Sequence, residues 1–112
     1  MKRGEVWLAH FPFTDDSAAK LRPVLVVSAD RFNSGDDVVV VPISSKPNRD
    51  DPFSIYLDPS HPEFSATGLR FPSAIKWTKL MAISKRVVTR RLGKLSQPRL
   101  NEVCESIASL VS

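Results

Sequence analysis

Cysteine, histidine and glycine are scarce in this chain of 112 residues, and their scarcity argues against several kinds of site. The single cysteine, Cys104, cannot form an internal disulfide or a thiolate metal cluster, which favours a reducing, cytoplasmic compartment. The sequence holds no glycine-rich phosphate loop and no HExxH zinc motif. We therefore expect neither nucleotide hydrolysis nor metal catalysis, and no cofactor.

Long apolar runs are also missing. No segment approaches the roughly 20 apolar residues needed to cross a bilayer, and no apolar signal-peptide core follows the basic start of the chain. The apolar fraction of 42% and the charged fraction of 25% are those of an ordinary globular protein. We expect a single domain over residues 1–112 and no membrane partner.

Acidic residues are rare in the carboxyl-terminal part. Residues 69–112 contain 9 Lys and Arg against 2 Asp and Glu, whereas residues 1–68 contain 7 against 10. The net charge of +4 thus hides a basic segment, which is typical of a face that binds nucleic acid or an acidic partner. A solvated basic face explains the same pattern, so both interpretations stay open at this point.

Most of the sequence consists of short segments with strand-like patterns. Alternation over Glu5–Phe11, an apolar run at 24–27 and a β-branched run at 38–43 predict three strands. Pro42 cannot donate to a ladder, so we expect it at a sheet edge or at a break in the strand. Further short extended segments are expected at 53–57, 68–71, 73–77, 81–83 and 87–89.

The end of the chain predicts one amphipathic helix. Ser96 is a suitable N-cap and Pro98 falls in the first turn. The apolar positions repeat at helical spacing, at Leu100, Val103, Cys104, Ile107, Leu110 and Val111. Cys104 lies on this stripe and is expected to pack in the core. Several strands followed by one helix favour a mainly β, mostly antiparallel half-barrel with the helix covering one end.

Arg22 is the leading candidate for chemistry. Pro23, which has a fixed φ and no amide hydrogen, pushes Arg22 toward extended geometry, so Arg22 is expected at the rim of an apolar strand. A guanidinium held there can bind a phosphate through two hydrogen bonds. The alternative is an ordinary rim arginine paired with a nearby aspartate.

A hydroxyl pair, Ser44 and Ser45, and a basic pair, Lys76 and Lys79, suit phosphodiester cleavage without a metal. In RNA the adjacent 2′-hydroxyl is the nucleophile, so the protein need only position the strand, move protons and stabilise charge on the phosphoryl oxygens. The structural alternative for the serines is a strand-end turn capped by hydroxyls.

Aromatic and histidine side chains have two interpretations each. Phe13 and Trp77 could stack on unpaired bases, and core packing is at least as good an interpretation of both. His10 is chemically suited to be a general base, but its place in an alternating strand favours a packed or rim histidine.

The order of these segments resembles the MazF/PemK (Kid) toxins of type II toxin-antitoxin systems. The resemblance rests on Gly4-Glu5-Val6-Trp7, on the segment from Arg22 to Ser28, on the segment from Val38 to Ser45 and on the helical end. It covers essentially the whole chain. It implies a small SH3-like (CcdB/PemK-type) barrel with a carboxyl-terminal helix, and a homodimer.

The same resemblance implies a sequence-specific, metal-independent endoribonuclease. Such an enzyme cuts single-stranded RNA, mRNA included, and leaves a 2′,3′-cyclic phosphate and a 5′-hydroxyl. The implied protein partner is a cognate antitoxin whose extended acidic tail fills the RNA groove. Two other functions remain open: a CcdB-like gyrase-binding poison, and a catalytically weakened relative that only binds an antitoxin.

Particular residues take roles through this resemblance. Arg22 matches the catalytic arginine, Ser44 falls where many members have a catalytic threonine, and Lys76 can replace an arginine's charge. Thr78 stands where relatives carry an aspartate and cannot act as a general base. RNA-binding contacts are expected from Phe13, Thr14, Lys20, Ser45, Trp77, Thr78 and Lys79.

Overall fold

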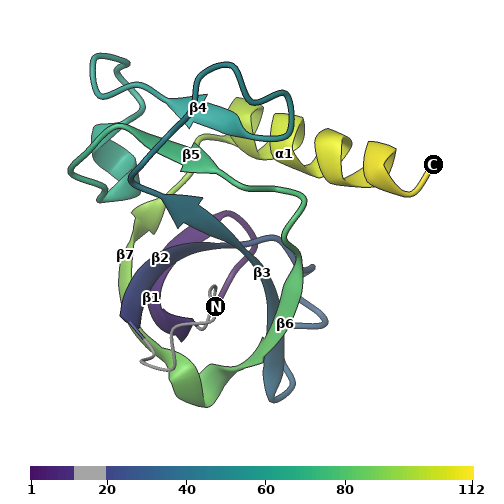
Figure 1. The fold of residues 1–112 in the computed structure, drawn as a ribbon. Helices are drawn as coiled ribbons and strands as arrows, with labels where there is room; N and C mark the ends of the chain where they lie inside the picture. The colour runs from purple at the N-terminus through teal and green to yellow at the C-terminus, as the bar shows by residue number, and fades with distance from the viewer. Residues whose placement is uncertain (12–19) are drawn as a thin grey trace.

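A computed structural model describes residues 1–11 and 20–112, which form seven strands, two short 3-10 helices and one α-helix (Figure 1). In chain order the elements are β1 (Glu5–Phe11), β2 (Lys20–Val26), β3 (Asp37–Ser44), β4 (Ile55–Leu57), η1 (Ser65–Thr67), β5 (Ser73–Ile75), β6 (Met81–Ser84), η2 (Lys85–Val87), β7 (Val88–Lys94) and α1 (Gln97–Leu110). All strand pairs are antiparallel. The predicted mainly β fold with a carboxyl-terminal helix is confirmed.

Strands β1, β2, β3, β6 and β7 curl into a partly open barrel, which is seen end-on in Figure 1. The sheet order is β4-β5-β3-β2-β1-β7, and β6 pairs with β3 outside this path. Small and branched side chains fill the inside of the barrel: Ala9, Val24, Val26, Val38, Val40 and Ile83. The barrel therefore encloses a packed core.

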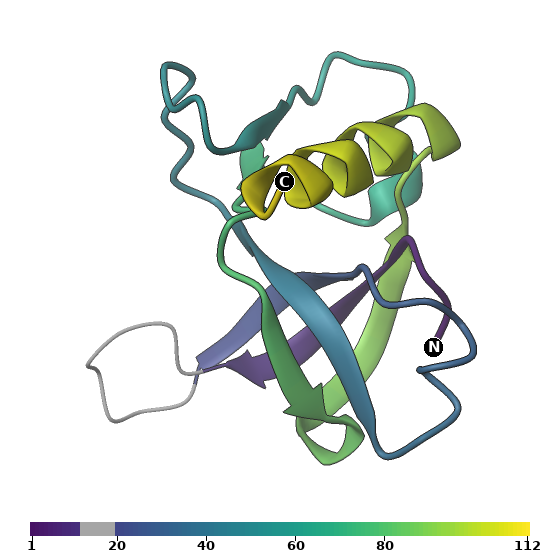
Figure 2. The same ribbon diagram turned by 90° about the vertical axis from the view of Figure 1, so that its right-hand side faces the viewer.

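Strands β4 and β5 and helix α1 lie together on one side of the barrel (Figure 2). Between them and the barrel wall is a second core, which includes Val6, Leu25, Val41, Ile43, Ile75, Trp77, Leu100 and Val103. Cys104 packs against this core, as predicted. This layer holds the strand ends that matter for the site.

Helix α1 begins as the sequence predicts. The Ser96 hydroxyl accepts a hydrogen bond from the Arg99 backbone N–H at 3.4 Å, which satisfies one of the free donors at the start of the helix. The apolar stripe, however, ends earlier than predicted, because Leu110 is 46% and Val111 86% exposed. The helix packs on the core from Leu100 to Ile107.

Pro42 does not break β3, and here the expectation needs correction. The strand pairs with β6 up to Val40 and with β5 from Ile43, and Pro42 lies between these two partners. Its carbonyl accepts from the Lys76 N–H at 2.9 Å. The missing amide hydrogen therefore falls where the neighbouring strand changes, which lets β3 run on through the proline.

The observed bounds of several other strands also differ from the predicted ones. The segments predicted at 53–57, 73–77 and 87–89 are strands at Ile55–Leu57, Ser73–Ile75 and Val88–Lys94, and residues 68–71 are not a strand. Gly68 has a φ of +75°, and a Cβ there would lie 2.2 Å from the Leu92 carbonyl oxygen. The chain before β5 thus presses directly on β7.

Candidate functional site

Arg22 and Ser44 occupy facing strands at the mouth of the barrel. Val24 pairs with Pro42, and two residues beyond that pair the strands reach Arg22 on β2 and Ser44 on β3. Residues two apart in a strand project from the same face, so both side chains share the face of Val24, which points into the barrel. Arg22 is half-buried there, and its strand starts earlier than predicted, at Lys20.

The Ser44 hydroxyl caps a turn and can also donate a hydrogen bond to a ligand. Its Oγ accepts a hydrogen bond from the Lys46 N–H at 3.1 Å, which caps the turn that follows β3. The hydroxyl proton can still be donated to a phosphate oxygen. Ser45, the next residue, lines a pocket with Pro23 and Ile43, so the two hydroxyls of the predicted pair do not share the face of Arg22.

Lys76 lies one row away on the face of Ser44. Its backbone pairs with the Pro42 carbonyl, and its Nζ lies 3.2 Å from Oδ2 of Asp51 in the loop after β3. A hydrogen bond from the Phe53 N–H, together with the bond and charge of Lys76, holds the pKa of Asp51 below its usual value. Lys76 therefore ties this loop to β5.

The row continues to an aromatic ring that the sequence analysis did not single out. Ala74 pairs with Ser44 on one side and with Tyr56 on the other, so all three residues share a face. The Arg49 guanidinium stacks over the Tyr56 ring at 4.2 Å from its centroid and lies 3.5 Å from Asp58. The only sequence signal was a polar loop before an aromatic strand residue.

The face that contains Arg22, Ser44, Lys76 and Tyr56 is called the strand-end row below. Lys20 lies two residues before Arg22 and is exposed on the same face. Thr78 is half-buried and Lys79 is exposed, in the turn after β5 where the Lys79 N–H bonds the Lys76 carbonyl. Phe13 and Thr14 lie outside the described residues.

Trp77 is not available for base stacking, contrary to the prediction. Its side chain is 7% exposed and belongs to the core beneath α1, where it meets the Phe53 ring edge-on at 6.0 Å and 61°. A ring enclosed in this way cannot also cover a nucleobase. Phe53, which is 57% exposed, is the aromatic side chain that reaches the surface at this place.

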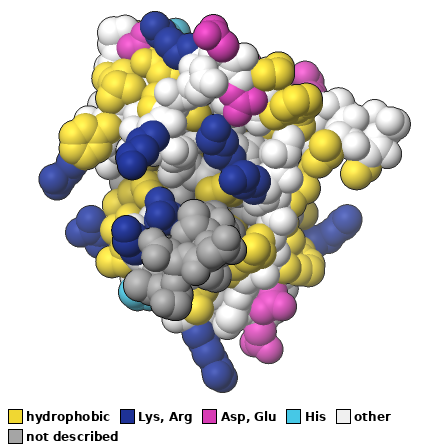
Figure 3. Space-filling model, viewed as in Figure 1, with side chains coloured by type: hydrophobic (Ala, Val, Ile, Leu, Met, Phe, Trp, Pro, Cys, Tyr) yellow, Lys and Arg dark blue, Asp and Glu magenta, His cyan; other side chains and the backbone are white. Residues whose placement is uncertain are grey.

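Positive charge gathers on the side of the molecule that carries the barrel mouth. Figure 3 shows Lys and Arg side chains over the middle of this face, with most Asp and Glu side chains toward its upper and lower edges. Fixed cations on a shared face raise the local concentration of a polyanion. The electrostatics of this face thus suit a nucleic acid strand.

A pocket of about 350 Å³ opens on the other face of the same strand ends. We call it the lateral pocket. It is lined by Leu8, Pro23, Ile43, Ser45, Gly68, Leu69, Arg70, Phe71, Ser73, Arg90 and Leu92. His10 is exposed on β1 two residues beyond Leu8, so it lies on the face of the lateral pocket and not on that of Arg22.

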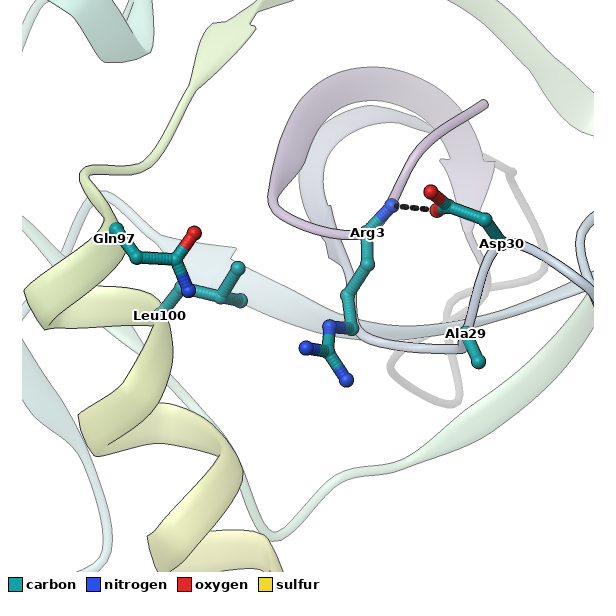
Figure 4. Close-up of a pocket in the computed structure, with 5 residues that line it drawn as sticks. All are labelled: Arg3, Ala29, Asp30, Gln97 and Leu100. Atoms are coloured by element: carbon teal, nitrogen blue, oxygen red, sulfur yellow. Dashed lines mark hydrogen bonds between the residues drawn. The ribbon is translucent and has the colours of Figure 1, made fainter.

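Another pocket, of about 390 Å³, lies between the amino-terminal segment and the start of α1 (Figure 4). Arg3 extends into it, and the Asp30 carboxylate accepts a hydrogen bond from the Arg3 backbone N–H at 2.8 Å. Ala29, Gln97 and Leu100 complete its lining. It contains none of the residues that the sequence singled out for chemistry.

Residues 1–11 and 20–112 contain neither a group of metal-binding side chains nor a helix that could span a membrane. There, no three His, Cys, Asp or Glu side chains come together in a group that could hold a metal ion. Within the same ranges, α1 is neither long enough nor apolar enough to cross a membrane, and no other helix is.

Both the sequence and the fold of this chain are similar to those of known proteins. Residues 2–111 match the model of a family described as PemK-like, MazF-like toxins of type II toxin-antitoxin systems. A probable endoribonuclease MazF of Mycolicibacterium smegmatis is 29% identical over 97 residues, which are 87% of this chain and 84% of that protein.

Solved structures agree on the fold. The Mycobacterium tuberculosis toxin MazF-mt6 superposes with a TM-score of 0.73 at 21% identity, over 94% of this chain and 93% of that one. A chain in a crystal structure of MazE–MazF from Deinococcus radiodurans gives a TM-score of 0.75 at 18% identity, over 99% of this chain and 94% of that one. An endoribonuclease in complex with its cognate antitoxin, from a mycobacterial species, gives 0.73 at 21%, over 97% and 92%.

Proposed function

Because the chain belongs to the PemK-like, MazF-like family of type II toxin-antitoxin toxins, we propose that it is a sequence-specific endoribonuclease that needs no metal. It cleaves single-stranded RNA, mRNA included, to a 2′,3′-cyclic phosphate and a 5′-hydroxyl. The observation that carries this proposal is the placement of Arg22 and Ser44 on one face of facing strands at a basic barrel mouth. The similar protein of Mycolicibacterium smegmatis, a probable endoribonuclease, supports the reaction class.

The chemistry requires little beyond positioning and charge. The 2′-oxygen attacks phosphorus and loses its proton, the bond from phosphorus to the 5′-oxygen breaks, and the departing 5′-oxygen gains a proton. Arg22 offers a fork of N–H donors to the phosphoryl oxygens as their negative charge grows. Ser44, with its Oγ already accepting from the Lys46 N–H, donates its own proton toward the phosphate.

The other residues of the strand-end row act on the RNA strand rather than on the cleaved bond. Lys20 extends the positive face along β2, and Arg49 over Tyr56 extends it toward β4. Lys76 reaches a phosphate only by leaving Asp51, so its role is linked to the position of the loop after β3. The carboxylate of Asp51, in the loop after β3, contacts this row through that lysine.

The proposal includes partners and a location. Two copies form a homodimer in the cytoplasm, and a cognate antitoxin with an extended acidic tail neutralises the toxin by covering the basic face. Solved relatives in complex with their antitoxins support this part. Charge complementarity supports it as well, because carboxylates along an extended chain match the cations of the strand-end row.

The decisive experiment incubates the purified protein, in the presence of a chelator, with a long unstructured RNA and maps the new ends. Discrete cuts with cyclic phosphate ends are expected, and Arg22→Ala should abolish them while leaving the melting temperature close to that of the wild type. Intact RNA under all conditions would refute the proposal, and growth inhibition without RNA cleavage would favour a binding poison such as a gyrase inhibitor.

A further inference from the structure

The lateral pocket lies one residue away from the catalytic candidates along each strand. Pro23 follows Arg22 and Ser45 follows Ser44, and each pair straddles the sheet because successive side chains alternate between faces. The ladder between β2 and β3 starts at the pair of Val24 and Pro42, so Arg22 and Ser44, both among the described residues, are not ladder partners. A strand of RNA held at the barrel mouth can therefore place a neighbouring nucleotide at this pocket.

The pocket has the interior of a site for a flat, uncharged ring. Leu8, Pro23, Ile43, Leu69 and Leu92 give it apolar walls, and its volume of about 350 Å³ is at the lower end of the range for small-ligand sites. Phe71 belongs to the lining, yet its side chain is 64% exposed. A ring in that position is free to stack on another ring.

Two cations belong to the same pocket. Arg70 and Arg90 are both exposed, and neither has an ion-pair or hydrogen-bond partner in the part of the chain that the structure describes. Arg90 is placed by its pairing with Leu8 across the β1–β7 ladder. Guanidinium groups beside an apolar recess match a ligand that is both flat and attached to phosphates.

The pocket is also built rigidly. The Ser73 hydroxyl donates to the Phe71 carbonyl at 2.7 Å, which fixes the backbone that carries the ring. Gly68 and Gly93 let the chain before β5 lie against β7, since a Cβ at Gly93 would come within 2.1 Å of the Ala66 carbonyl oxygen. A preformed recess loses little conformational entropy on binding, so it can discriminate between similar ligands.

We propose that the lateral pocket binds one unpaired nucleobase next to the cleaved phosphate, with Phe71 stacking on the base and Arg70 and Arg90 holding its flanking phosphates. It thereby sets the base preference at one position of the cleavage sequence. This inference rests on the proposed endoribonuclease function. A nucleobase fits better than a peptide side chain because the recess combines an exposed flat ring with two cations that have no ion-pair or hydrogen-bond partner among residues 1–11 and 20–112.

The test sequences the cleavage ends that each variant produces from a single-stranded RNA pool with random bases. Phe71→Ala should flatten the base preference at one position by about tenfold, the size of one lost base–aromatic stack, while cleavage continues at the remaining preferred positions. Phe71→Tyr should retain the preference, because it keeps a stacking ring. Phe32→Ala is the matched control, since Phe32 is 48% exposed and lies outside the pocket and the strand-end row.

Arg90→Gln gives the second arm. It should lower kcat/KM by a similar factor for all sequences and flatten the salt dependence of binding by about 0.7 in log–log slope, the value for one phosphate contact on a single strand. An unchanged cleavage motif in Phe71→Ala would overturn the inference. So would a change in sedimentation or in antitoxin binding with the motif intact, because the pocket would then serve a protein partner. Failure of the wild type to cut any RNA would instead refute the nuclease function itself.

Discussion

Replacement of Arg22 tests most directly whether the barrel mouth is a phosphate site. The guanidinium is half-buried on the inward face of β2, opposite Ala9 and on the face that Ser44 shares. Removing one fixed donor from a developing oxyanion typically slows a reaction by about 10²–10³-fold. Arg22→Ala should therefore lower the cleavage rate by at least this factor, and Arg22→Lys, which keeps the charge but loses the fork, by about tenfold or more.

The assay is single-turnover cleavage of an end-labelled RNA at saturating protein with a chelator present. Arg86→Ala is the matched control, because it removes the same charge from an exposed position in η2. A double-mutant cycle with Ser44→Ala adds a geometric test: if both groups act on one phosphate, their effects combine non-additively. A rate for Arg22→Ala within about threefold of the Arg86→Ala rate, less than about 0.7 kcal/mol in barrier height, would refute the assignment.

Three further outcomes are expected. Gly68→Ala should lower the free energy of unfolding in urea by about 2–4 kcal/mol, because the φ of Gly68 is +75° and the new Cβ would lie 2.2 Å from a β7 carbonyl oxygen. The control is Gly35→Ala, where the nearest atom to the new Cβ is 3.6 Å away, and it should change the free energy of unfolding by less than about 0.5 kcal/mol. The Arg99 hydrogen bond lowers the pKa of Glu63, so the pair stabilises the fold above the ordinary carboxyl pKa and this contribution is lost as pH falls through the lowered one. Below about pH 4.5 the free energy of unfolding of the wild type should fall by up to about 1 kcal/mol more than that of Glu63→Gln. Identical pH dependence of stability in the two proteins would contradict this prediction. Asp51→Asn should release Lys76 for RNA and steepen the log–log salt dependence of binding by about 0.7, and weaker binding with an unchanged slope would show that the ion pair serves the loop alone.

Local sequence patterns were sufficient for three of the longer elements, but not for the full length of β2 and β7. Alternation identified β1, the valine run identified β3, and Ser96 with Pro98 identified the start of α1. They gave only approximate bounds for short strands such as Ser73–Ile75, predicted at 73–77, because its three residues are all buried and so show no alternation. The predicted extent of the apolar stripe on α1 was also wrong, because Ile107 still packs on the core whereas Leu110 and Val111 are exposed.

The parts of the site that the sequence missed depend on contacts between distant segments. Which of two adjacent serines shares the face of Arg22 is decided by the pairing of Val24 with Pro42, which no local pattern contains. Trp77 lies in a basic segment, but its burial comes from packing beneath α1. The lateral pocket exists because residues near Gly68 lie against β7, a contact that joins segments more than twenty positions apart.

Strand β3 joins the two cores, and this affects how the domain unfolds. It pairs with β2 along one edge and with both β5 and β6 along the other, so the barrel core and the core beneath α1 share one backbone. Neither core can detach while β3 stays in place, and the buried amides of β3 should be among the last to exchange with deuterium. Ser44, the final residue of that strand, is placed by its pairing with Ala74, so loss of catalysis and loss of structure should follow a single transition.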